Sequence, residues 1–317
     1  MFTDELEHAI LETLAYSDIF DYPLRLDELY SYLPIRTEIE QMSRSLESLN
    51  GQVGKNDGYY FLTDREIIVE IRKQRNTYSY KFYQLALMYG QILGSLPFIR
   101  MVALTGSLAV MNSSTNADFD YMLIAAPGRV WMARGFALLL NRFTRLFGHT
   151  LCPNLIVSES SLAWSTHDLY SAHELYQMIP IAGMDVYLKL MKANPWAEEF
   201  FPNGFKTFKS PQGSRVLFQK LLETPLRGKV GDHIERWEMK RKIMKLSKQS
   251  GFGKETLFNA EVCQGNFGHH NQRTNQALQE RLRQYINAKT VGEQTNSDHE
   301  RNLSHQPAGF QQGKELI

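Results

Sequence analysis

The chain has 317 residues, enough for two or three domains of ordinary size. Apolar residues make up 43% of the chain and charged residues 22%, a balance that supports globular cores. The formal net charge is +1, so the overall charge excludes a general electrostatic attraction to nucleic acid.

Membrane and disulfide signals are both missing from the sequence. No apolar run approaches the length of a membrane span, and the N-terminal MFTDELEHAILE is acidic and amphipathic, unlike a signal peptide. The only cysteines, Cys152 and Cys263, are far apart, so we expect reduced thiols without a metal framework. These observations predict a cytoplasmic protein with no membrane partner.

Residues 1–62 predict three helices followed by a hairpin. Apolar residues at helical spacing, such as Leu6, Ile10 and Leu14, predict a first helix over residues 5–20. A short second helix over 26–33 ends before Pro34, and a third covers 37–49. The turn at 55–58 then closes a hairpin. This order resembles a winged helix-turn-helix domain.

The third helix of this domain has a mixed charge. A recognition helix normally presents basic and amide side chains to DNA. Here the candidates are accompanied by three glutamates; the set is Arg36, Gln41 and Arg44 with Glu38, Glu40 and Glu47. The residues therefore favour a module for protein contact or for packing beside another domain. Binding to nucleic acid is left open but is not favoured.

Residues 63–97 predict a helical connector. Basic residues such as Arg72 and Arg75 alternate with aromatic residues such as Tyr80 and Phe82. Such a segment can bind nucleic acid, but it is more typical of a helix that packs its aromatic side between two domains.

The most informative segment is residues 102–127, which predict a strand, a Gly-Ser turn, a short helix, a polar loop and a second strand. Side chains alternate faces along a strand, so Asp118 and Asp120 project from one face while Phe119 points into the core. Two neighbouring carboxylates repel each other unless a cation lies between them. They suit Mg²⁺, which proteins hold with one or two carboxylates plus substrate phosphates.

The turn before the short helix predicts a phosphate site. Gly106 allows the backbone to approach a ligand closely, and Ser107 stands where the helix begins. Unpaired backbone N–H groups at a helix start attract phosphate oxygens. Gly106 and Ser107 are therefore candidate nucleotide-binding residues, beside the candidate metal ligands Asp118 and Asp120.

These residues resemble the signature of the DNA polymerase beta-type nucleotidyltransferase superfamily, in which a strand and Gly-Ser precede Asp-x-Asp on the next strand. The resemblance covers residues 98–160. It implies a small mixed sheet with flanking helices and transfer of a nucleoside monophosphate from a nucleoside triphosphate to an acceptor. It also implies that Asp118 and Asp120 are catalytic and hold Mg²⁺.

The chain departs from this superfamily at one position. A third carboxylate usually lies on a later strand, and the matching residue here is Asn154, on a strand expected over 150–157. An amide is neutral, so it neither replaces the missing charge nor deprotonates an acceptor hydroxyl. Asn154 is the possible third position, and it predicts low intrinsic activity.

The remaining chain predicts mainly helices. Residues 129–147 predict an amphipathic helix with arginines, Arg134 among them, on or near its polar side. We expect most of them on a solvated face, although some could reach a triphosphate. Residues 161–289 predict a helical region, including a basic helix over 229–248 that packs its apolar side and leaves its charges in water. Residues 290–317 are almost devoid of apolar side chains and predict a disordered tail. The predicted fold class is α+β.

Two functions remain open from the sequence. The first is an Mg²⁺-dependent nucleotidyltransferase whose acceptor is a small molecule, a protein hydroxyl or an RNA end. The second is a regulatory protein that senses nucleotide and contacts DNA or a protein through its winged helix.

Overall fold

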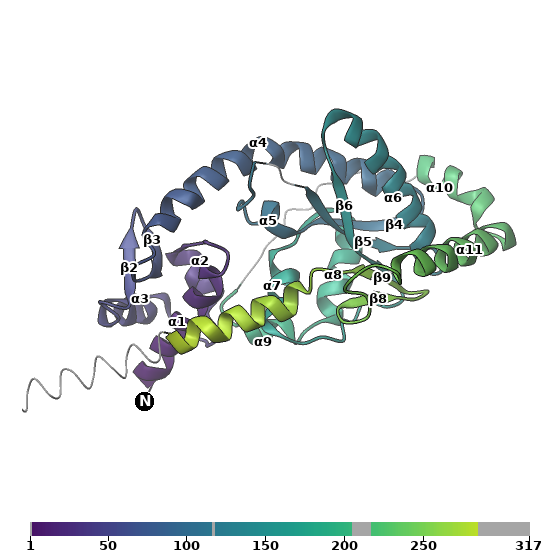
Figure 1. The fold of residues 1–317 in the computed structure, drawn as a ribbon. Coiled ribbons are helices and arrows are strands. Elements are labelled where there is room, and N and C mark those ends of the chain that lie inside the picture. Colours follow the sequence, from purple (N-terminus) through teal and green to yellow (C-terminus); the bar gives the residue numbers. More distant parts are fainter. Residues whose placement is uncertain (1, 116–117, 205–216, 285–317) are drawn as a thin grey trace, which may run out of the picture.

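The computed structural model describes residues 2–115, 118–204 and 217–284. They form an α+β structure with a three-stranded antiparallel sheet near the N-terminus and a six-stranded mixed sheet in the centre (Figure 1). The predicted fold class is therefore confirmed at this level. The predicted tail, residues 290–317, lies outside the described residues.

The N-terminal domain contains the predicted helices and hairpin. Its elements are α1 (Phe2–Asp18), β1 (Leu24–Arg25), α2 (Leu26–Ser31), α3 (Ile39–Ser48), β2 (Val53–Asn56) and β3 (Tyr59–Leu62). The strands pair antiparallel in the order β1-β3-β2. The apolar stripes predicted from helical spacing form one core, in which Ile10, Leu29, Met42 and Leu62 are fully buried.

A single long helix, α4 (Ile67–Ser95), connects this domain to the central sheet. At its N-terminal end Arg72 forms an ion pair of 2.6 Å with Glu28 and lies 4.0 Å from the ring centre of Tyr22. At its other end Leu93 packs into the core of the central sheet. The helix spans both parts of the molecule, as Figure 1 shows, and serves as the predicted connector.

The central sheet has the strand order β7-β4-β5-β6-β9-β8. Its strands are β4 (Ile99–Leu104), β5 (Phe119–Ala125), β6 (Leu151–Ser158), β7 (Ile179–Ala182), β8 (Thr256–Phe258) and β9 (Val262–Gly265). Strands β5 and β6 are parallel, and each of the other neighbouring pairs is antiparallel. The helix α6 (Val130–Thr144) forms the connection that the parallel pair requires.

Alternation along β5 separates two cores. Phe119, Tyr121 and Leu123 face α4 and α6. Met122 and Ile124 face the opposite layer, which is formed by α7 (Leu169–Gln177), α8 (Met184–Ala193) and α9 (Ala197–Phe200). Helices therefore cover both faces of the sheet, which leaves the ends of its strands available for a functional site.

The region 161–289 was predicted as helical, and the structure corrects this prediction. Besides its helices, the region supplies β7, β8 and β9 to the central sheet. These strands have three or four residues each, so their two-residue alternation is too short to recognise, and Pro180 lies inside β7.

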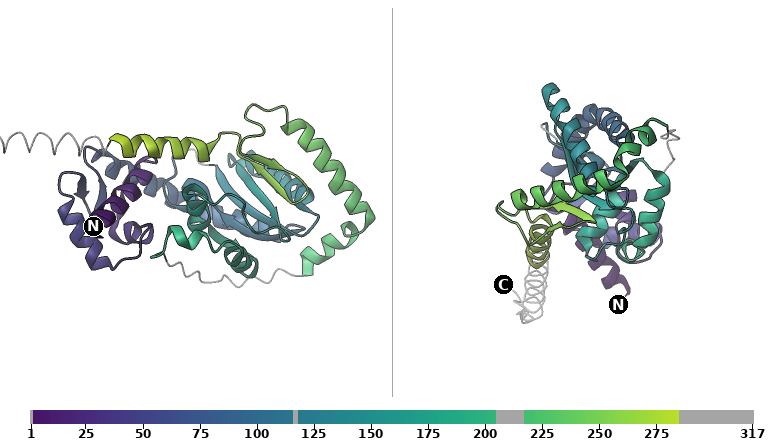
Figure 2. Two further views of the ribbon diagram at one scale, coloured as in Figure 1. Left: turned by 90° about the horizontal axis from the view of Figure 1, so that it is seen from below. Right: turned by 90° about the vertical axis from the view of Figure 1, so that its right-hand side faces the viewer.

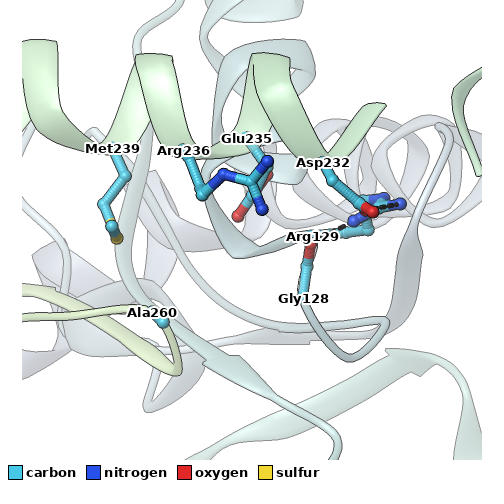
Figure 3. Close-up of a pocket in the computed structure, with 7 residues that line it drawn as sticks. All are labelled: Gly128, Arg129, Asp232, Glu235, Arg236, Met239 and Ala260. Atoms are coloured by element: carbon cyan, nitrogen blue, oxygen red, sulfur yellow. Dashed lines mark hydrogen bonds and ion pairs between the residues drawn. The ribbon is translucent and has the colours of Figure 1, made fainter. Parts of the chain in front are cut away.

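The helix α11 (Lys229–Leu246) packs on α6, but differently from the prediction. Its Glu235 accepts hydrogen bonds of 2.8 Å from the backbone N–H groups of Trp131 and Met132 and so caps the start of α6. Figure 3 shows Glu235 on the inner side of α11, with Arg129 beside Asp232. Leu246 is buried as expected, whereas Trp237 is 57% exposed.

The chain then returns to the N-terminal domain through a helical segment at residues 270–284, the last described helix (Figures 1 and 2). Leu278 enters the core of that domain, and Arg281 Nε lies 2.7 Å from Asp18 Oδ2. None of the helices in the described ranges is long and apolar enough to cross a membrane.

Candidate active site

The tips of β4 and β5 position the two aspartates. Asp118 directly precedes β5, Asp120 is its second residue, and Phe119 between them is buried in the core. Thr105, at the end of β4, donates its N–H to the carbonyl oxygen of Asp120 at 2.9 Å. The structure therefore places both carboxylates on one side of the sheet, beside the turn that follows β4.

That turn contains Gly106 and Ser107, both exposed. They begin the short helix α5 (Gly106–Ala109). Gly106 has a φ of +67°, and a Cβ atom placed on it would lie 2.5 Å from Asp120 Oδ2. Glycine is thus required by the close approach of the Asp120 carboxylate, whereas the sequence had suggested the approach of a ligand. The turn and the carboxylate are neighbours in space.

Asn154 also reaches the pair. Its Nδ2 donates a hydrogen bond of 2.7 Å to Asp120 Oδ1. The pairing of β5 with β6 shifts register between Tyr121 and Met122, so Asn154 is the extra residue of a bulge between Pro153 and Leu155. The thiol of Cys152 lies 3.7 Å from Asp118 Oδ2. Sequence reasoning identified Asn154 but not Cys152.

The electrostatics of the pair suit a cation. Burial, together with the nearby charge of Asp118, raises the pKa of Asp120 to about 6, although the hydrogen bond from Asn154 opposes this rise. Burial and the charges of Asp118 and Asp120 also raise the pKa of Cys152 to about 12, so the thiol stays protonated and donates to Asp118. A cation between the carboxylates would offset the cost of burying these charges and the repulsion between them.

Glu174 is a further acidic residue near the site, which sequence reasoning missed. It lies on α7, which packs beside α5. Burial and the charge of Asp120 raise the pKa of Glu174 to about 7, and a hydrogen bond with Tyr170 acts in the opposite direction. The sequence shows only a helical pattern here, so nothing in it indicates that this glutamate faces the aspartates.

The donor set fits Mg²⁺ bound together with phosphates. Among the residues that the structure describes, no group of three or more His, Cys, Asp or Glu side chains is placed to hold a metal ion. Asp118 and Asp120 supply two oxygen ligands on one side. Mg²⁺ commonly keeps waters and takes phosphate oxygens at its remaining positions. The two carboxylates could therefore hold a divalent cation whose other ligands are water or phosphate oxygens.

The loop between α5 and β5 is tied to the rest of the molecule. Tyr22 of the N-terminal domain donates its hydroxyl to the carbonyl oxygen of Val110 at 2.9 Å. Asn112 Nδ2 donates to the carbonyl oxygen of Phe20 at 3.0 Å, and Ser113 N donates to Ser79 Oγ of α4 at 2.9 Å. The loop that leads to Asp118 thus carries direct contacts to the N-terminal domain and to α4.

Comparison with known proteins gives no independent support for a family. No family model matches the chain, and neither curated proteins nor solved structures show a significant match to it.

Proposed function

We propose that this chain is an Mg²⁺-dependent nucleotidyltransferase that transfers a nucleoside monophosphate from a nucleoside triphosphate to an acceptor hydroxyl. The observation that carries the proposal is the contact between the turn and the carboxylates: Gly106 lies against Asp120, and Asp118 is two residues away on the same face. This contact supports the proposal, because it brings the Gly-Ser turn beside the Asp-x-Asp pair at the strand tips.

In this proposal each residue has a defined task. The backbone N–H groups at Gly106 and Ser107 bind phosphate oxygens, and Asp118 and Asp120 hold Mg²⁺. The bound Mg²⁺ would neutralise charge on the phosphates. Asn154 holds Asp120 in place through its hydrogen bond of 2.7 Å but takes up no proton. The proposal therefore includes a low intrinsic rate.

A radioactive assay tests the reaction. Nucleoside triphosphates labelled at the α-phosphate are incubated with Mg²⁺ and a panel of hydroxyl compounds, proteins and RNA ends. We expect label in an acceptor with equal release of pyrophosphate, and loss of both in Asp118→Asn. Asp185→Asn, at an exposed position of α8, is the matched control. Release of phosphate instead of pyrophosphate would refute nucleotidyl transfer.

A second candidate function is a nucleotide-sensing regulatory protein, with the N-terminal winged helix as the contact module. The contacts of Tyr22 and Phe20 with the loop 110–113 favour it, because they connect that domain to the segment leading to Asp118. If this function holds, Tyr22→Phe will change nucleotide affinity although Tyr22 lies outside the site. Equal affinity in the variant and the wild type would count against it.

A further inference from the structure

A cavity of about 280 Å³ lies beside β6; Asp118 and Asp120 are not among the residues that line it, but two of the lining side chains contact them. Cys152 and Asn154 form part of its wall, and the same two side chains contact Asp118 and Asp120. The opposite wall comes from α6 and β9. A molecule in this cavity would therefore be separated from the carboxylates by single side chains.

The cavity exists because one strand edge is left open. Strand β9 pairs with β6 only along Leu155–Val157, so among the described residues no strand covers the preceding part of β6 on that side. Pro153 has no N–H group to satisfy there. The N–H of Leu151 instead donates to Asn141 Oδ1 at 3.0 Å. The open edge is thus stable without a neighbouring strand.

Arg134 of α6 lines this cavity, although its sequence position had suggested a solvated face. Its Nη1 is buried and has no hydrogen-bond partner within the described part of the chain. The neighbouring thiol of Cys263 is uncharged, because burial raises its pKa to about 11. Burial and the charge of Arg134 also lower the pKa of Lys242. Arg134 is only half-buried, but an interior N–H group of its guanidinium without an acceptor is costly, and an anion that reaches it from the cavity would supply the acceptor.

We propose that the cavity binds the acceptor of the transfer reaction, and that this acceptor is a small molecule with an anionic group held by Arg134. This inference rests on the proposed function. Leu138 and Phe267 contribute apolar walls for a carbon skeleton. The volume is slightly below the usual range of ligand-binding pockets and suits a small molecule.

This placement defines the transfer step. A hydroxyl oxygen of the acceptor forms a bond to the α-phosphorus of the nucleoside triphosphate. The bond between that phosphorus and the bridging oxygen breaks, and pyrophosphate leaves with the bonding electrons. The hydroxyl proton passes to water. The product is a nucleoside monophosphate ester of the anionic acceptor.

Calorimetric titration with inorganic phosphate and with citrate tests the anion site in the full chain. We expect Arg134→Gln to weaken binding of the preferred anion at least tenfold, and Arg134→Lys to retain part of the affinity. The control is Arg142→Gln, an exposed arginine on the same helix, which should bind as wild type does. The preferred probe distinguishes a phosphate-bearing acceptor from a carboxylate-bearing one. Unchanged affinity in Arg134→Gln would overturn the proposal.

Two further measurements complete the test. If Arg134→Gln does not fold, the Nε–H resonance of Arg134 in the wild type serves instead: a shift on addition of the anion supports the site, and its absence refutes it. Mg²⁺-nucleotide binding is measured in Arg134→Lys as well. We expect it to equal the wild type; a loss would place the triphosphate in this cavity and refute the acceptor assignment. If the chain binds an anion through Arg134 but binds no nucleotide, the proposed transferase activity is refuted and the anion site is retained.

Discussion

The carboxylate of Asp120 lies against the backbone of Gly106. A Cβ atom on Gly106 would stand 2.5 Å from Asp120 Oδ2 and 3.2 Å from Asp120 Cβ, and its φ of +67° disfavours any side chain. The turn proposed to bind phosphate and the carboxylate proposed to hold the metal therefore depend on the same residue. A side chain at this position has to displace Asp120.

Gly106→Ala should accordingly affect both stability and binding. The strained φ and the displaced carboxylate should cost about 1–3 kcal/mol in the free energy of unfolding. Affinity for Mg²⁺-nucleotide should fall at least tenfold. Gly135→Ala is the control, since Gly135 lies in α6 with no atom near its Cβ position. It should leave binding unchanged and stabilise the protein by about 0.5–1 kcal/mol. If Gly106→Ala binds nucleotide normally, the turn does not take part in nucleotide binding.

The raised pKa of Asp120 predicts a pH-dependent stability in the presence of a chelator. Its pKa is about 6 in the folded chain, against 3.8 for the unperturbed group, because of burial and the charge of Asp118. The folded state therefore binds the proton more tightly, and the contribution of this group to stability is lost as the pH rises through about 4 to 6.

Asp120→Asn should for this reason raise the free energy of unfolding at pH 7.5 by about 1–3 kcal/mol and have little effect at pH 4. Denaturant unfolding in chelator measures both values. Added Mg²⁺ should stabilise the wild type but not the variant. Destabilisation of Asp120→Asn at pH 7.5 would mean that the ionised carboxylate is a favourable part of the metal-free fold.

Asn154→Asp should make the site dependent on Mg²⁺. The substitution replaces a hydrogen bond of 2.7 Å to Asp120 by repulsion between two carboxylates. We expect a lower melting temperature in chelator, recovery with Mg²⁺, and faster nucleotidyl transfer. Asn154→Ala removes the amide without adding charge and should show neither the recovery nor the gain in rate. If Mg²⁺ does not stabilise Asn154→Asp, position 154 lies outside the metal site.

The 317-residue chain should not bind duplex DNA at micromolar concentration. Glu40 and Glu47 are exposed on the same helix as Arg44, and the exposed Glu38 directly precedes that helix. A gel shift at about 150 mM salt, where surface charges are screened beyond roughly 8 Å, should show no complex at micromolar protein. Glu40→Lys combined with Glu47→Lys should increase non-specific binding. Sequence-dependent binding below micromolar concentration by the wild type would refute this expectation.

The long, strongly patterned elements could be predicted from the sequence. The third helix was expected over 37–49 and is Ile39–Ser48; the strand expected over 150–157 is Leu151–Ser158. Both elements could be predicted because the apolar pattern or the flanking turn is a feature of residues that are neighbours in the sequence. By contrast, β7 and β9 pair with strands far away in the chain, and β8 pairs only with β9. Each of these strands has so few residues that no alternation can be recognised.

The same difference between local patterns and long-range contacts applies to the candidate site. Two residues of alternation place Asp118 and Asp120 on one face. The resemblance pointed to Asn154, which reaches Asp120 as the extra residue of the bulge in β6. Glu174 and Arg134 could not be predicted, because their positions depend on how α7 and α6 pack on the sheet. Cys152 could not be predicted, because the pairing that sets it opposite Asp120 joins two distant segments. Such packing is settled by contacts between distant segments.

The most direct test of the account is the linkage between nucleotide and metal at Asp118 and Asp120. A non-hydrolysable nucleoside triphosphate is titrated into the full chain by calorimetry, with Mg²⁺ and with chelator. The experiment is repeated with Asp118→Asn combined with Asp120→Asn, and with Asp185→Asn as the control. We predict binding by the wild type and the control only when Mg²⁺ is present, and no binding by the double variant. Equal affinity in chelator, or undiminished binding by the double variant, would contradict the assignment of these carboxylates to the metal.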